Sequence, residues 1–138
     1  MRILIICSKI FYSKIPQIRK TLEYNGHEVS LPNSYDNIYA ESDSWKEGYL
    51  AHSYFKKQMF QSSKLKIENC DAVLTLNFSK GNLKNYVGGA TFIEMYEAYM
   101  NNKKIYMMND IPKGILYDEI CGFNPIIIHN DFSLINGN

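Results

Sequence analysis

The sequence predicts a single-domain α/β protein, residues 1–138, in which helices cover both faces of a doubly wound, five-stranded parallel sheet. Two observations predict this fold. Five short, unbroken apolar runs recur along the chain, which is typical of strands that are buried on both faces. Segments with apolar residues at helical spacing separate these runs, and this alternation favours parallel strands joined by helices.

The strands and helices are expected to follow one another in strict alternation. The apolar runs place strands at 3–7, 27–31, 71–77, 104–108 and 125–129. The helical patterns lie at 16–24, 46–68, 91–101 and 116–120. The first helix is closed by Asn25-Gly26, a C-cap signal, and the second is expected to break near Ser62-Ser63. Residues 32–47 lack a clear period and are expected to form a long loop or a partly ordered cap.

Five strands in this arrangement favour the flavodoxin-like, or Rossmann-like, strand order 2-1-3-4-5. Ligands of such sheets bind beyond the carboxyl ends of the strands, at the point where the strand order reverses. The first and third strands flank that point. We therefore expect the binding site in residues 8–12 and 77–94.

Composition narrows the classes of partner. The net charge is +1 and the lysines are scattered, so neither a nucleic acid polymer nor a membrane is an expected partner. No apolar run approaches the roughly 20 residues of a membrane span, so a soluble, cytoplasmic protein is expected. Cys7, Cys70 and Cys121 form no Cys-x-x-Cys motif and lie in or beside apolar runs. We expect three buried thiols in a reducing compartment, and no metal site.

The segment ahead of the third helix carries the strongest functional signal. Gly88 and Gly89 precede the helix, and glycines let a backbone approach a ligand closely. The free N–H groups of a helix N-terminus suit a phosphate or a hydroxyl-rich sugar. Asn85 and Thr91 are expected to cap this helix or to bind the ligand, and Glu94 is expected in its first turn.

Two interpretations of Glu94 remain open at this point. A first-turn carboxylate gains roughly 0.3–1 kcal/mol from the helix dipole, which is an ordinary structural role. Alternatively, a glutamate among apolar residues that faces a cleft can act as a nucleophile. Glycoside chemistry uses such carboxylates to trap a sugar as a covalent ester.

Several motifs together carry a family resemblance. They lie at 71–77, 85–95, 103–106 and 109–112, and the likeness continues at 118–120 and 125–127. These residues resemble the nucleoside 2-deoxyribosyltransferase-like superfamily, above all its small members, whose helix opens with a Gly-Gly-Asn-Thr-like turn. The resemblance covers residues 68–131 well, is generic over 1–31 and is weak over 32–67.

The resemblance implies chemistry at an N-glycosidic bond. The superfamily contains transferases that exchange bases between deoxyribosides and hydrolases that cleave deoxynucleotides, and both use a glutamate that matches Glu94. It implies a nucleoside or nucleotide as substrate, no cofactor, and a homodimer or higher homo-oligomer. A flavodoxin-like electron carrier is not favoured, because the loop after the first strand lacks the Ser/Thr-rich phosphate cradle of flavin-binding proteins with this fold.

Two positions depart from the family pattern and favour a second hypothesis. Tyr96 stands where the family often has a small residue, and Ser62, Ser63 and Lys64 stand where classical members carry an aspartate. The acid that would protonate the leaving base is therefore not identified by a motif. The alternative function is a non-catalytic module that senses or sequesters a small nucleotide.

The remaining candidates follow the strand ends. Ser8, Lys9 and Tyr12 follow the first strand, where Lys9 is expected to hold a phosphate as a point charge. Asn77 and Asn109 follow the third and fourth strands and are further candidates for substrate binding. His52, on the long helix, is a candidate proton donor because a histidine titrates near neutral pH. A lone histidine on a helix is more often structural.

Overall fold

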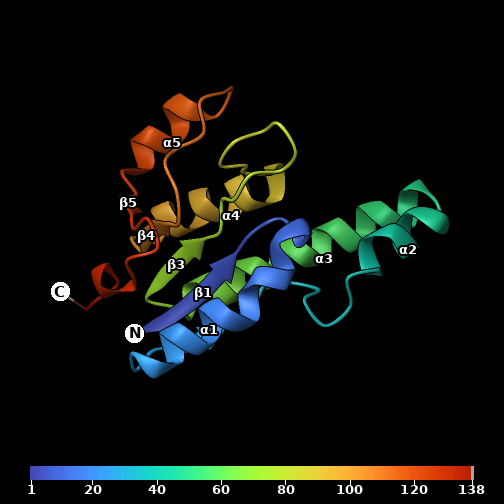
Figure 1. The fold of residues 1–138 in the computed structure, drawn as a ribbon. Coiled ribbons are helices and arrows are strands. Elements are labelled where there is room, and N and C mark those ends of the chain that lie inside the picture. Colours follow the sequence, from blue (N-terminus) through green and yellow to red (C-terminus); the bar gives the residue numbers. More distant parts are fainter. Residues whose placement is uncertain (138) are drawn as a thin grey trace.

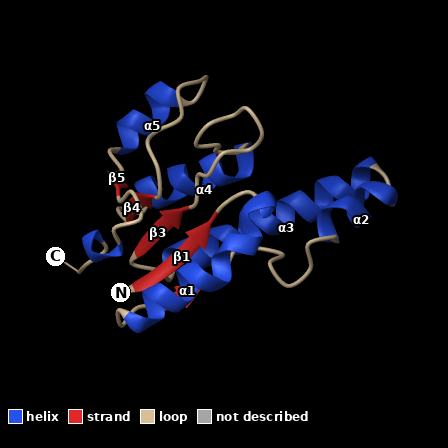
Figure 2. Cartoon of the chain, viewed as in Figure 1, coloured by secondary structure: helices blue, strands red, loops and turns tan. Residues whose placement is uncertain are grey.

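A computed structural model, which describes residues 1–137, confirms the five-stranded sheet with the order β2-β1-β3-β4-β5. All four pairings of neighbouring strands are parallel, and helices lie on both sides of the sheet (Figures 1 and 2). The strands are β1 (Arg2–Ile6), β2 (Glu28–Ser30), β3 (Ala72–Thr75), β4 (Lys104–Met107) and β5 (Ile126–Ile127). The helices are η1 (Lys9–Lys14), α1 (Ile15–Tyr24), α2 (Ala40–Lys46), α3 (Tyr49–Glu68), α4 (Gly89–Met100), α5 (Tyr117–Phe123) and η2 (Phe132–Leu134).

Alternate residues of the central strands fill two separate cores. Ile3 and Ile5 of β1 pack with α1 on one face of the sheet. Leu4 and Ile6 of the same strand pack with residues of α3, α4 and α5 on the other face. Each of these four side chains is fully buried, which stabilises the fold by roughly 1.5–3 kcal/mol per side chain. Burial on both faces explains why these strands are unbroken apolar runs.

The segment between β2 and β3 differs most from the expectation. Residues 40–46 form α2, so the expected long loop contains a helix. Helix α3 also continues through Ser62 and Ser63 without a break. The two serine hydroxyls bond to Asn33 and Glu94 in other parts of the chain, so they do not compete for the backbone of their own helix. In Figure 1, α2 and the beginning of α3 project beyond the sheet.

Two further expectations are wrong in detail. Helix α4 begins at Gly89 and has no acidic residue in its first turn, so Glu94 lies in the second turn. The dipole of a helix acts mainly within its first turn, so it does little for this carboxylate. Cys7 and Cys70 are buried as expected, but Cys121 is exposed because it faces outward from the short helix α5.

None of the helices in residues 1–137 combines the length and the hydrophobicity that a membrane span requires. The same residues contain no group of three or more His, Cys, Asp or Glu side chains placed to hold a metal ion.

Candidate active site

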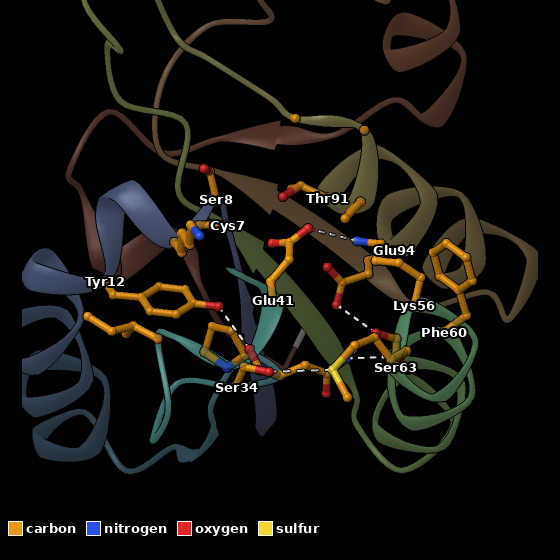
Figure 3. A pocket seen from close by; sticks show the side chains of 18 of the residues that line it. Cys7, Ser8, Tyr12, Ser34, Glu41, Lys56, Phe60, Ser63, Thr91 and Glu94 are labelled. Atoms are coloured by element: carbon orange, nitrogen blue, oxygen red, sulfur yellow. Dashed lines mark hydrogen bonds and ion pairs between the residues drawn. The ribbon is translucent and has the colours of Figure 1, made fainter. Parts of the chain in front are cut away.

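A cavity of about 430 Å³ lies where the strand order reverses, beyond the carboxyl end of β1. Its walls come from the segments after β1 and β2, the start of α2, one face of α3, the loop after β3 and the start of α4. Figure 3 shows side chains from the segments after β1 and β2 and from α2, α3 and α4 pointing into this space. Ligand pockets of small molecules commonly have volumes of roughly 300–1,000 Å³, so this cavity is large enough for a small-molecule ligand.

Glu94 lines this cavity and is held by a chain of two hydrogen bonds. The Ser63 hydroxyl donates to Oε2 of Glu94 over 3.1 Å. Nδ2 of Asn33 donates in turn to the Ser63 oxygen over 2.7 Å and to the Met59 carbonyl over 2.9 Å. Because Asn33 satisfies the acceptor of Ser63, the serine proton is directed to the carboxylate. The chain therefore fixes the orientation of Glu94.

The environment of Glu94 raises its pKa from 4.5 to about 7. Burial is the largest cause, because it removes water from the charged form. The hydrogen bond from Ser63 opposes this effect, and the charges of Lys66 and Lys56 oppose it further. At neutral pH the carboxyl group is therefore divided between its ionised and its protonated form.

An ion pair spans the cavity from α2 to α3. Nζ of Lys56 lies 3.8 Å from Oε1 of Glu41, and both residues line the cavity. Lys56 shares one face of α3 with Met59, Phe60 and Ser63, which follow it at three, four and seven positions. This face of α3 therefore lines the cavity. Lys56 and Ser63 are its polar residues, and the apolar residues Met59 and Phe60 lie between them.

Most of the predicted site residues meet at this cavity. Ser8, Lys9, Tyr12, Gly88, Gly89 and Thr91 line it together with Glu94. The Tyr12 hydroxyl donates to the Asn33 carbonyl over 2.9 Å, and burial raises the pKa of its phenol. Gly88 is the N-cap residue of α4, and neither Asn85 nor Thr91 caps the helix through its side chain.

Four other predicted residues do not line the cavity: His52, Asn77, Asn85 and Asn109. His52 stacks on Trp45 at 3.7 Å between ring centroids and bonds through Nδ1 to the Ser44 hydroxyl, which joins α2 to α3. Asn77 is fully buried and exchanges hydrogen bonds with Asn109, which connects the loops after β3 and β4. Asn85 adopts a left-handed turn conformation with φ of 55°. Their functional roles stay predictions that this geometry does not support.

Sequence reasoning missed Asn33, Glu41 and Lys56 as members of the site, and it treated Ser63 as a gap in a family motif. The helical spacing of Lys56 and Ser63 was a usable signal, since it predicts that both lie on one face of α3. Nothing local marks Asn33 or Glu41, because their positions depend on how the segment after β2 folds back over the sheet.

The fold and the cavity define an α/β domain with a half-buried glutamate at the switch point of a parallel sheet. Solved structures that share this fold include two nucleoside-processing enzymes. The CMP N-glycosidase of Clostridium botulinum has a TM-score of 0.54 at 17% sequence identity, covering 92% of this chain and 83% of that one. The 2-deoxyribosyltransferase of Bacillus psychrosaccharolyticus has a TM-score of 0.54 at 14% identity, covering 78% and 71% respectively.

The chain therefore has a nucleoside 2-deoxyribosyltransferase-like fold, as the sequence motifs predicted. No protein-family model and no curated protein matches the sequence.

Proposed function

We propose that this protein cleaves or transfers at the N-glycosidic bond of a nucleoside or nucleotide, with Glu94 as the carboxylate nucleophile. The observation that carries the proposal is the place of Glu94 in a cavity large enough for a small-molecule ligand, where Ser63 orients its carboxylate. The names of the two fold neighbours, a CMP N-glycosidase and a 2-deoxyribosyltransferase, support the same chemistry.

In the proposed reaction, an oxygen of Glu94 attacks C1′ of the sugar. The bond from C1′ to the base nitrogen breaks, its electron pair leaves with the base, and the sugar stays as an ester of Glu94. Water or a second base then attacks C1′ and releases the carboxylate. The ionised form of Glu94 is the nucleophile, so Ser63, Lys66 and Lys56 promote the reaction by favouring that form.

A phosphate on the substrate fits the cationic part of the cavity lining. Lys9 and Lys80 both line the cavity and are exposed, and the N-terminus of α4 presents Gly88 and Gly89 to the same space. We propose that these groups hold the 5′-phosphate of a nucleotide, which places the sugar over Glu94.

The test is base release from a panel of nucleosides, deoxynucleotides and nicotinamide nucleotides, followed by chromatography. Glu94→Ala is expected to abolish release from every substrate that the wild type cleaves. Glu119→Ala is the control, since Glu119 is an exposed residue of α5 that does not line the cavity. Base release that survives Glu94→Ala would remove Glu94 from the nucleophile role.

One observation favours the alternative function, a nucleotide-binding module without turnover. The side chain that bonds to Glu94 is the Ser63 hydroxyl, whereas the resemblance implied a carboxylate in that region. Calorimetric titration with the same panel separates the two functions. Tight binding without base release, unchanged by Glu94→Gln, would favour the module. The homo-oligomer implied by the resemblance is also a proposal, which light scattering checks.

A further inference from the structure

Lys56 lines the cavity, as Lys9 and Lys80 do, and it is the cavity lysine whose charge acts on Glu94. Its Nζ atom lies 3.8 Å from Oε1 of Glu41. Its charge lowers the pKa of Glu94, although less than the Ser63 hydrogen bond and the Lys66 charge do. The side chain is 30% exposed, so part of it remains open to a ligand. Figure 3 shows the ion pair of Lys56 with Glu41, and the carboxylate of Glu94 lies next to it in this view.

Four other proton-bearing groups near Glu94 already donate a hydrogen bond or have a pKa that burial raises. Lys66 donates to the Leu31 carbonyl over 2.9 Å and does not line the cavity. The Tyr12 hydroxyl donates to the backbone of Asn33, and burial raises its pKa. Burial also raises the pKa of the Cys7 thiol to about 12. The Ser63 proton is bonded to Glu94 itself.

Resting on the proposed function, we propose that Lys56 is the acid partner of Glu94. Its ammonium group faces the departing base and gives a proton to it as the glycosidic bond breaks. Glu41 is a positioning residue, which holds Lys56 in the cavity through the ion pair.

The proton transfers balance over one hydrolytic cycle. Glu94 forms a bond to C1′, the bond from C1′ to the base nitrogen breaks, and the base takes that electron pair together with a proton from Lys56. Lys56 is left as a neutral amine. A water molecule then attacks C1′, its proton passes to Lys56, and the carboxylate of Glu94 is released. The products are the free sugar and the free base, which carries the transferred proton on the nitrogen that was bonded to C1′. Both side chains return to their starting state.

The position of Glu41 is itself fixed by α2. Trp45 of α2 stacks on His52 of α3, and the buried Ser44 bonds to the same histidine. These contacts hold α2 against α3 on the side where Glu41 meets Lys56. The contact between His52 and α2 thereby supports the acid group indirectly.

The experiment measures kcat/KM of the wild type and of Lys56→Met on two substrates. One is the best nucleotide of the panel; the other carries the same sugar and the same base with an electron-withdrawing halogen, which makes the departing base a weaker proton acceptor. A general acid contributes roughly 10²–10⁴-fold to such a step. We expect a loss of about 10²-fold on the ordinary base and a loss several times smaller on the halogenated base.

Two further variants separate proton transfer from charge and from folding. Lys56→Arg keeps the positive charge near Glu94 but does not release a proton at this pH, so it is expected to show the same leaving-group dependence as Lys56→Met. Lys57→Met is the matched control, because Lys57 is exposed and lies outside the cavity. Glu41→Gln is expected to lower kcat on the ordinary base more than on the halogenated base.

The outcomes separate this inference from the function on which it rests. An equal loss on both substrates, full activity of Lys56→Met, or full activity of Lys56→Arg would each overturn the assignment of Lys56 as the acid. Failure of the wild type to release base from any substrate would instead overturn the proposed function, and the acid role with it. Melting temperatures close to that of the wild type show that each variant has folded.

Discussion

Replacing Glu94 by glutamine is expected to stabilise the protein, and increasingly so as the pH rises. The folded-state pKa of Glu94 is raised, so the folded protein binds this proton more tightly than the unfolded chain does. Between the unfolded value of 4.5 and the folded value of about 7, the unfolded chain releases the proton and the folded protein keeps it. The wild type therefore loses stability through this interval. Glutamine has the same shape and no charge, so it escapes the loss.

The size of the effect follows from the interval. The pKa of Glu94 is 4.5 in the unfolded chain and about 7 in the folded protein. Each pH unit between these values costs about 1.4 kcal/mol, so the wild type loses about 3 kcal/mol of unfolding free energy. This value is an upper bound, because the cavity admits water to part of the carboxylate. The Ser63 hydroxyl can still donate to the amide oxygen of the variant, so little is lost in exchange.

The assay is urea unfolding of both proteins at intervals from pH 4 to pH 9. The difference in unfolding free energy is expected to grow between pH 4.5 and pH 7 and to stay constant above pH 7. Glu47→Gln, which removes an exposed carboxylate outside the cavity, is the control and is expected to stay within about 0.5 kcal/mol throughout. A difference for Glu94→Gln that does not change with pH would refute the reasoning that burial controls this group.

Three shorter predictions concern other parts of the site and the surface. Ser63→Ala removes a hydrogen bond that lowers the pKa of Glu94, so the acidic limb of the pH–activity profile is expected to move to higher pH by about one unit or more; Ser62→Ala should move it less. Lys9→Met is expected to raise KM for nucleoside monophosphates about tenfold, as for loss of a charged contact, and to leave KM for nucleosides unchanged. Cys121 is expected to react rapidly with a thiol reagent in the folded protein, while the two buried cysteines react only on unfolding.

The sheet was predictable because its signal is local. Each central strand is a short apolar run. A strand that is buried on both faces can be identified from its own residues, without knowledge of the strands that pair with it. The break expected at Ser62-Ser63 was wrong because serine is a weak helix former only when nothing else engages its hydroxyl. Here Asn33 and Glu94 bond to these hydroxyls. Such contacts join residues about 30 positions apart, and no local pattern contains them.

The position of Glu94 within its helix could not be predicted from the sequence either. The sequence predicts that both glycines precede the helix, but Gly89 is already helical, which moves Glu94 out of the first turn. The sequence places this segment and Ser8, Lys9 and Tyr12 at one cavity, because strand ends gather at one edge of a parallel sheet. Whether the carboxylate is stabilised by the dipole or destabilised by burial depends on one turn of helix and on packing.

Because the dipole of α4 gives Glu94 little help, the interactions that oppose the effect of burial on its pKa come from α3. Ser63 bonds to the carboxylate, Lys56 and Lys66 attract it, and all three residues belong to α3. The beginning of α3 extends beyond the sheet (Figure 1). The cavity face of α3 therefore lies opposite α2 and the segment between β2 and α2, and it does not pack against the strands. A polar face at this position does not disturb the packing of the sheet. Substitutions on the cavity face of α3 are therefore expected to change the pH dependence of the reaction before they change the stability of the fold.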